Sequence, residues 1–500
     1  MLSPFPALMA VSTPQEMEEV TAADYLVIGA GAMGMAFVDT LLTETSKTIV
    51  MIDRYARPGG HWTTAYPFVR LHQPAAAYGV NSTRLERDDG IEEFGWNKGL
   101  ADCSSRDDVC AYFEKVMKKT FLASGRVQYF PKCEYIQEGK FRAILTGKTY
   151  RVAQDTCIVD ATYSQTVVPS MRPPPYDVAS DVDMVTPNDL AAVSRGYEGY
   201  TVVGGGKTSM DACLWLLENG ITAAQITWIR PRDSYLLDRS VFQPGPLSAA
   251  RVKASLEGTV ESVMAALSVE DFLQRQVAKH LLLQLDDEVT PTMFHCATVS
   301  RLEFDALKEI RSVIRKGHVT RVTRDTVALQ HGSYKPIPDT LYIDCSAGSI
   351  PKVAPVPIFR SRNITLQPVR YCQQTFSAAL IAHVEATYQD AKLKNGLCRP
   401  VPMPNEPIDY PLVMLQTNLN TLGWLKQPQM VAWLKDCRLN IFKSPVPDDP
   451  EQRIAQQKQT MAIVEAASKK IQQLLDGLPE TEAAKMRAQL KDFYPKPAHL

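Results

Sequence analysis

Two glycine-rich turns, each between an apolar strand and a helix, constrain the fold of this 500-residue chain most strongly. The first turn holds Gly29, Gly31 and Gly34 in YLVIGAGAMGMAF, and the second holds Gly204 and Gly206 in YTVVGGGKTSMDA. Such a turn lets the backbone approach the pyrophosphate of a dinucleotide, which the N-terminus of the following helix then binds. The pair of turns therefore predicts an α/β chain with two Rossmann-like domains.

The first turn has the full pattern of a dinucleotide site. A strand is expected over 24–28, a helix over 33–42 and a second strand over 48–52. That second strand ends at Asp53, and an acid there can accept hydrogen bonds from ribose hydroxyls. The alternative is a glycine turn in an unrelated βαβ unit. The cofactor contacts predicted here are Gly29, Gly31, Met33, Gly34, Asp53 and Arg54.

The second turn, GGGKTS, looks at first like the end of a P-loop, the phosphate-binding loop of nucleotide triphosphatases. A P-loop needs an earlier glycine, and this chain has Thr201 at that position, inside the strand. The loop is therefore too short to wrap a triphosphate, and a second dinucleotide turn is the better interpretation. Its predicted cofactor contacts are Gly204, Gly206, Lys207, Ser209 and Asp211.

Arginines follow the strand after the second turn. Lys207 is expected near the pyrophosphate, and Asp211 is expected to orient the amides of the first helical turn. The strand over 225–229 then ends in WIRPR instead of an acid. Arg230 and Arg232 stand where a 2′-phosphate would be bound, which favours NADPH over NADH. Two arginines on a surface loop are the alternative.

Composition excludes several other classes of protein. Apolar residues make up 45% of the chain and charged residues 22%, with a formal net charge of −1. These values are ordinary for a globular protein and predict neither nucleic acid nor an anionic membrane as a partner. No apolar run approaches the ~20 residues of a membrane helix. Residues 1–21 are expected to be a flexible leader and not a signal peptide.

The ten cysteines are scattered and form no CxxC pair. They are predicted to be reduced residues of a cytoplasmic protein. The CxxxxC pair that disulfide reductases carry just after the first nucleotide turn is also missing, which argues against a thiol relay. Histidines and cysteines show no spacing typical of zinc ligands, so no metal is expected.

The segment RPGGHW after Asp53 and the turn GGGKTSMD resemble the flavin-containing monooxygenases and their Baeyer–Villiger relatives. In that family a GGTW-like segment runs under the FAD, and the GxGxSxxD turn binds NADPH. The resemblance implies FAD contacts from Gly60, His61 and Trp62. It also implies that His61, Arg70 and His72 hydrogen-bond the flavin or a departing peroxide, although His72 could equally be a loop histidine with satisfied hydrogen bonds.

Two further segments fit this family. The strands in CIVDATYS and LYIDCSAGS end at Asp160 and Asp344, and such strands connect the two domains of these flavoproteins. A helix is expected from Phe376 in RYCQQTFSAALIAHVEATY. The resemblance implies that its N-terminus faces the flavin, with Gln374 and Ser377 as contacts beside Gln373. A packing helix with a polar start is the alternative.

The layout implied by these motifs divides the chain into an FAD domain, an NAD(P)H domain and helical additions. The NAD(P)H domain is expected to carry a helical insertion over 235–290, and two amphipathic helices are expected over 450–493, split by Gly477 and Pro479. The expected ranges are 22–165 plus 344–395 for FAD, 166–343 for NAD(P)H and 396–500 for the helical extension.

The motifs leave the reaction open. The fingerprint FxGxxxHxxxWP of Baeyer–Villiger enzymes and its flavin-monooxygenase version are absent before the second turn, where the chain reads MVTPNDLAAVSRGYEGYTVV. The first hypothesis is an NADPH-dependent monooxygenase that forms a flavin C4a-hydroperoxide with O2 and oxygenates a small organic substrate. The second is an FAD oxidase, dehydrogenase or reductase without oxygen insertion. The third is a non-redox nucleotide-fold protein, like regulators of small GTPases, which the second turn disfavours.

Overall fold

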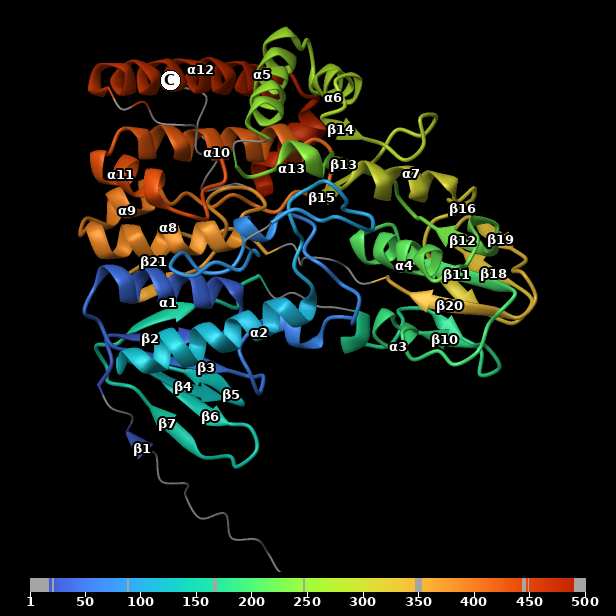
Figure 1. Ribbon diagram of the computed structural model, residues 1–500, viewed down its shortest axis with the longest axis horizontal. Helices are drawn as coiled ribbons and strands as arrows, with labels where there is room; N and C mark the ends of the chain where they lie inside the picture. Colours follow the sequence, from blue (N-terminus) through green and yellow to red (C-terminus); the bar gives the residue numbers. More distant parts are fainter. Residues whose placement is uncertain are drawn as a thin grey trace, which may run out of the picture.

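The computed structural model describes residues 18–19, 22–87, 90–164, 169–245, 248–346, 353–442, 447 and 449–489. Two parallel sheets lie side by side, and a stack of helices rises above the first of them (Figure 1). Of the predicted leader, only β1 (Glu18–Glu19) belongs to the described part, and residues 1–17 and 20–21 lie outside it.

The first sheet has the order β21-β22-β8-β2-β3-β4, and all neighbours are parallel except the β21–β22 pair. Its strands are β2 (Tyr25–Ile28), β3 (Ile49–Asp53), β4 (Val127–Pro131), β8 (Cys157–Asp160), β21 (Phe359–Arg360) and β22 (Asn363–Thr365). A smaller sheet joins β1 to β5 (Cys133–Gln137), β6 (Lys140–Ala143) and β7 (Thr149–Arg151).

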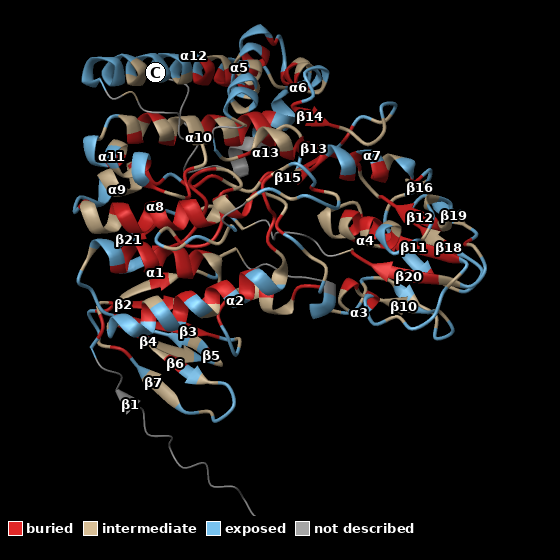
Figure 2. Ribbon diagram, in the orientation of Figure 1, coloured by how far each residue is buried: buried red, intermediate tan, exposed pale blue. Residues whose placement is uncertain are grey.

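Helix α1 (Ala32–Glu44) is the most enclosed helix of this unit. It packs against α8 (Gln374–Thr387), and residues 33–42 are all buried (Figure 2). An apolar stretch such as MAFVDTLL suits this position because neither face of the helix meets water. The long loop between β3 and β4 carries α2 (Arg106–Val116), which begins at a capping box formed by Ser105 and Asp108.

The second sheet is parallel throughout and has the order β10-β20-β11-β12-β16. Its strands are β10 (Met184–Val185), β11 (Gly199–Val203), β12 (Ile226–Ile229), β16 (Ser312–Ile314) and β20 (Thr340–Asp344). Its helices are α3 (Pro187–Leu190), α4 (Lys207–Glu218) and α7 (Arg301–Glu309). A four-stranded sheet beside it contains β9 (Asp177–Val178), β17 (Val319–Val322), β18 (Val327–Leu329) and β19 (Gly332–Tyr334).

The sequence predicts a helical insertion over 235–290, but the structure shows that this region is only partly helical. It contains α5 (Ala249–Ala265) and α6 (Val269–Ala278), but it begins in β13 (Ser234–Asp238) and ends with β14 (Leu282–Leu283). Strand β13 pairs with both β14 and β15 (Met293–Val299). Tyr235 and Leu237 pack into one hydrophobic core and Leu236 packs into another. The side chains therefore alternate between two faces, as in any strand, but both faces are buried.

Helices make up most of the described chain after β22. They are α9 (Ala391–Leu397), α10 (Asp409–Leu425), α11 (Pro428–Asp436), α12 (Pro450–Asp476) and α13 (Glu480–Gln489). In Figure 1, α12 lies over α10, which in turn lies over α8 and α1. The predicted break at Gly477 and Pro479 is confirmed, because α12 ends and α13 begins around these residues.

The predicted fold class is confirmed: the chain is an α/β protein with two Rossmann-like units and helical additions. Within the described residues, no helix combines the length and the apolar character needed to cross a bilayer.

Candidate functional site

The first glycine turn is held in the close packing expected of a dinucleotide site. Gly29 has a φ of +101°, and its N–H donates to the Ile52 carbonyl at 2.8 Å. A Cβ on Gly34 would overlap the Gly29 carbonyl oxygen, and a Cβ on Gly60 would lie 2.9 Å from the Gly31 Cα. Only glycine therefore allows these backbones to touch, and no side chain caps the N-terminus of α1.

Asp53 closes this turn from the end of β3. Its carboxylate accepts from the Ala30 N–H at 2.5 Å and from the Tyr55 N–H at 2.7 Å. Burial raises the pKa of Asp53, and these two hydrogen bonds counteract only part of that shift. A carboxylate can accept about four hydrogen bonds, so Asp53 keeps acceptor capacity for ribose hydroxyls. Met33 is buried in the core of the unit, and Arg54 is exposed beside the Tyr55 ring.

The second turn repeats this geometry. Gly204 has a φ of +135°, its N–H donates to the Ile229 carbonyl at 2.9 Å, and no side chain caps α4 at Gly206. A Cβ on Gly204 would lie 2.8 Å from the Cys345 carbonyl oxygen. Ser209, in the place equivalent to Gly34, is fully buried and donates its hydroxyl to the Gly206 carbonyl at 2.7 Å.

Asp160 and Asp344 occupy equivalent positions beside the two turns. Asp160 lies opposite Ile28 in the β2–β8 pair, and Asp344 lies opposite Val203 in the β11–β20 pair. The Asp160 carboxylate accepts from the N–H and hydroxyl of Thr162 at 2.8 and 2.7 Å. The Asp344 carboxylate accepts from the Ser346 N–H at 3.1 Å and the Tyr176 hydroxyl at 3.0 Å. Each carboxylate thus holds the residues that follow its strand in a tight turn, beside a glycine turn.

The sequence predicts that Asp211 orients the amides at the start of α4, but in the structure it has other partners. Its carboxylate forms an ion pair with Lys207, one turn earlier, and accepts from the Tyr66 hydroxyl at 2.6 Å. As the fifth residue of α4, Asp211 is too far along the helix to reach the free N–H groups. Tyr66 comes from the loop after the first glycine turn, so this bond joins the two units.

The two predicted phosphate arginines differ in their surroundings. Arg230 is only 4% exposed, lies 3.3 Å from Asp233 and stacks over Trp228, and burial lowers its pKa. Arg232 is partly exposed and bonds only to the carbonyl and hydroxyl of Thr292. No carboxylate of the described residues forms an ion pair with Arg232, so it is the arginine better placed for a phosphate.

The three predicted catalytic residues have different surroundings. His61 lies in the short helix Gly60–Thr64 and stacks on Trp62, whose indole N–H donates to the Tyr78 hydroxyl at 2.7 Å. Loss of solvation lowers the pKa of His61 to about 4. Arg70 is exposed and forms an ion pair with Glu92. Among the three, only His72 lines the cavity described next.

A cavity of about 40 Å³ adjoins His72. His72 Nδ1 accepts from the Thr298 N–H at 3.3 Å, and its carbonyl accepts from Arg239 Nε at 2.9 Å. Burial, with the positive charges of Lys207 and Arg239, lowers the pKa of His72 to about 3, so its ring is neutral. The cavity is lined by His72, Gln73, Leu237, Phe242, Cys296, Thr298, Tyr371, Cys372, Gln373, Ile441 and Phe442.

The start of α8 forms another wall of this cavity through Gln373, the residue before the helix. Gln374 begins α8 and is partly exposed. Ser377 is fully buried, and its hydroxyl donates to the Gln373 carbonyl at 2.7 Å and accepts from the Val369 N–H at 3.0 Å. The Ser377 side chain therefore fastens the turn before α8 and is not directed to a ligand.

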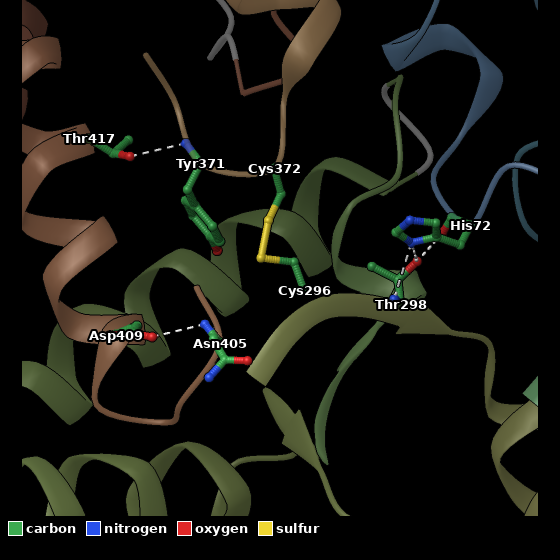
Figure 3. The surroundings of a disulfide bond; sticks show 8 residues. All are labelled: His72, Cys296, Thr298, Tyr371, Cys372, Asn405, Asp409 and Thr417. Atoms are coloured by element: carbon green, nitrogen blue, oxygen red, sulfur yellow. Dashed lines mark hydrogen bonds between the residues drawn. A yellow bond between two sulfur atoms is a disulfide. The ribbon is translucent and has the colours of Figure 1, made fainter. Parts of the chain in front are cut away.

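The prediction that all ten cysteines are reduced is wrong. Cys296 of β15 and Cys372, just before α8, form a disulfide across a sequence separation of 76 residues, and both line the cavity (Figure 3). The other eight cysteines form no disulfide. Sequence spacing could not reveal the pair because the two residues come from different units.

Sequence reasoning also missed the residues that brace the cavity. Arg239 is almost fully buried and bonds Glu303 at 2.7 Å, Asn97 at 2.8 Å and the His72 carbonyl. Arg370 is buried beside Phe376, with its guanidinium carbon 3.9 Å from the ring centroid. Neither arginine belongs to a recognisable motif, and only the folded chain brings them into contact with His72 and Gln373, which line the cavity.

No protein-family model matches the sequence. The chain is 49% identical over 424 residues to the uncharacterized protein Rv2000 of Mycobacterium tuberculosis and, with the same values, to the uncharacterized protein Mb2023 of Mycobacterium bovis. Each alignment covers 85% of this chain and 78% of the relative. The chain therefore belongs to the same family as these mycobacterial proteins.

Similar solved structures include OTEMO in complex with FAD and NADP and an open structure of cyclohexanone monooxygenase. Both are 13% identical to the chain with a TM-score of 0.45, and they cover 73% and 74% of it. The alignments span 83% and 88% of those proteins. A likeness this weak does not transfer a reaction to the chain.

Proposed function

We propose that the chain is an FAD-dependent oxidoreductase that takes hydride from NADPH and uses O2 to oxygenate a small organic substrate. The observation that carries this proposal is the matched geometry of the turns at Gly29 and Gly204. Each puts a positive-φ glycine and an uncapped helix N-terminus at the carboxyl edge of a parallel sheet. That arrangement binds the pyrophosphate of a dinucleotide.

The residues around the first turn fit FAD. The backbones of Gly31 and Gly60 form a cradle that a Cβ would fill, and Asp53 has acceptor capacity left for the ribose. When bound, FAD supplies a ring system that can accept a hydride and react with O2. His61 and His72 would form hydrogen bonds to the cofactor through uncharged imidazole rings. Because His72 Nδ1 accepts from Thr298, its ring proton is on Nε2 and can be donated to a ligand.

The second turn fits a nicotinamide dinucleotide, and Arg232 supports NADPH over NADH. Arg232 follows β12, which pairs directly with β11 before the turn, and its partners on Thr292 are neutral. Arg232→Ala is expected to raise the KM for NADPH about tenfold and to leave that for NADH unchanged. Arg230→Ala is the matched control for structure, since Arg230 is paired with Asp233. Equal effects on both coenzymes would contradict the proposed 2′-phosphate contact.

The main test follows the flavin through one cycle. Purified protein is expected to carry FAD, and anaerobic NADPH is expected to bleach its absorbance. Mixing the reduced enzyme with O2 should then give a transient spectrum that matches neither oxidised nor reduced flavin. Immediate release of peroxide without such a transient would rule out oxygen insertion. Colourless protein that takes up no FAD would end the whole proposal.

A second candidate, a flavin-dependent reductase without oxygen insertion, is supported by one observation, the disulfide that borders the cavity. The cytoplasmic location also belongs to the proposal. It is inferred from the eight cysteines that form no disulfide, because thiols stay reduced in that compartment.

A further inference from the structure

The Cys296–Cys372 disulfide lies where the two cofactor-binding units meet. Cys296 comes from β15, which follows the second glycine turn in the chain. Cys372 comes from the segment between β22 of the first sheet and α8, and that segment starts at the carboxyl edge of the sheet, where the Leu366 N–H donates to the Asp160 carbonyl. The bond therefore links the carboxyl edge of the first sheet to the second unit.

The disulfide is open to the cavity and unequally exposed. Cys296 is 3% exposed, whereas Cys372 is partly exposed, and both line the cavity with His72. In Figure 3 the imidazole of His72 and the two sulfur atoms lie in the same region, with Thr298 beside them. A disulfide buried in a core could not exchange electrons with a ligand, but this one borders the cavity that His72, a proposed flavin contact, also lines.

The surroundings of Cys372 favour the negative charge of a thiolate. Cys372 comes immediately before Gln373, the N-cap of the 14-residue helix α8, and a helix N-terminus stabilises a thiolate. Arg370, two residues earlier, bonds only to the neutral side-chain oxygens of Gln373 at 3.3 Å and Asn440 at 2.8 Å. Within the described ranges no carboxylate forms an ion pair with it. Arg370 therefore places a positive charge beside Gln373, the N-cap of α8.

We propose that the Cys296–Cys372 disulfide is redox-active and receives electrons from the reduced flavin. The proposal rests on the FAD and NADPH sites proposed above but not on oxygen insertion. Two electrons pass from NADPH through the flavin to the disulfide, and the S–S bond breaks. The two sulfurs take up two protons, one from solvent and one that left NADPH as part of the hydride. The net reaction converts NADPH, one proton and the disulfide into NADP+ and two thiols.

This assignment gives the two cysteines different roles. Cys372 is the more exposed sulfur and the one near a positive potential, so it is the thiolate that an alkylating reagent is expected to modify first. Cys296 is the buried partner that closes the disulfide again. In a cytoplasmic protein, disulfides are usually catalytic or redox-sensing, which agrees with this division.

The test counts thiols in the FAD-loaded full-length protein before and after anaerobic NADPH. Samples are alkylated under denaturing conditions, and labelled cysteines are located by peptide mass spectrometry. We expect Cys296 and Cys372 to be unlabelled before NADPH and labelled after it. An anaerobic titration is expected to consume about two equivalents of NADPH per flavin, against about one in Cys372→Ser. Cys157→Ser, which removes a partly exposed free cysteine, serves as the matched control.

The outcomes separate this inference from the proposed function. Flavin reduction by one equivalent of NADPH, without new labels, would show that the disulfide is structural. Labelling of both cysteines before NADPH would show that no disulfide forms. If NADPH fails to reduce the flavin, the proposed function fails, and photochemical reduction of the flavin still tests its coupling to the disulfide. If Cys372→Ser does not fold, the thiol count of the natural protein decides alone.

Discussion

Gly206 is the residue at which cofactor binding can be separated from folding. Its φ is −96°, and a Cβ built there meets no heavy atom within 4 Å. Because Gly206 is the N-cap of α4, where alanine is less favourable than glycine, Gly206→Ala is expected to lower the free energy of unfolding by about 1 kcal/mol or less. The new methyl group would nevertheless occupy the approach of the pyrophosphate, so the KM for NADPH should rise about tenfold. Thermal unfolding and steady-state flavin reduction measure the two effects.

Gly34→Ala is the contrasting substitution at the first turn. Its Cβ would overlap the Gly29 carbonyl oxygen and lie 3.3 Å from the Ala161 Cβ. Helix α1 would have to move away from β2, which is expected to cost about 1–3 kcal/mol of stability and to lower the FAD content. If Gly34→Ala and Gly206→Ala proved equally stable, the close packing assigned to the first turn would be incorrect.

His61 and His72 make the folded protein sensitive to acid. The pKa of His61 is lowered to about 4 and that of His72 to about 3, whereas both return to about 6.5 in the unfolded chain. Below about pH 6.5 the unfolded chain therefore binds more protons than the folded one. Stability is full above that pH and falls by about 1.4 kcal/mol per pH unit for each histidine as the pH drops toward 4.

Urea unfolding at about pH 7.5 and 5.5 measures this loss. The double variant His61→Asn, His72→Asn is expected to lose most of the difference between the two pH values, and His331→Asn, on the surface, is expected to keep it. An unchanged acid response in the double variant would mean that neither histidine is kept neutral by burial.

At the scale of elements, Tyr66 joins the loop of the first unit to helix α4. The Tyr66 hydroxyl donates to Asp211 at 2.6 Å, and Asp211 is also paired with Lys207. Tyr66→Phe removes this bond and keeps the ring that packs against Phe68. A hydrogen bond to a charged group contributes about 1.5–3 kcal/mol. We expect lower stability and slower flavin reduction by NADPH, with NADPH affinity changed less than twofold.

Stopped-flow reduction at several NADPH concentrations separates the rate from the affinity. Tyr135→Phe, in the small sheet of the first unit, removes a hydroxyl that bonds only to the Gly139 N–H and serves as the control. A rate equal to that of the natural protein would show that the Tyr66 contact does not set the orientation of the units.

The elements themselves could largely be predicted because each carries a local signal. The strand before Gly29 and the strand ending at Asp53 are continuous apolar runs, as expected of strands covered on both faces. Strand β13 was missed because it is buried on both sides and lies next to two long helices, so its pattern resembles a helical insertion. Asp211 was misread because its partner Tyr66 is distant in the sequence.

At the scale of the whole molecule, the glycine turns could be recognised and the cavity could not. A turn depends on neighbouring residues, whereas the cavity combines a loop at His72, the strand of Cys296, the start of α8 and residues after α11. No periodicity links such segments. The disulfide is the clearest case, because its two cysteines lie in different units and share no motif. The cavity and its disulfide thus depend on tertiary structure, whereas each glycine turn is specified by neighbouring residues.

The buried ion pair between Arg239 and Glu303 holds the segments around this cavity together, since Arg239 also bonds the His72 carbonyl and Asn97. Glu303→Gln would leave the buried guanidinium without its counter-charge, which is expected to cost about 3–5 kcal/mol and to slow flavin reduction by NADPH. Glu261→Gln, in the exposed pair with Lys279, should cost less than about 1 kcal/mol. Chemical unfolding of both variants measures the difference. Equal losses would mean that Arg239 is stabilised by its neutral partners alone, and that the cavity wall does not depend on the charge of Glu303.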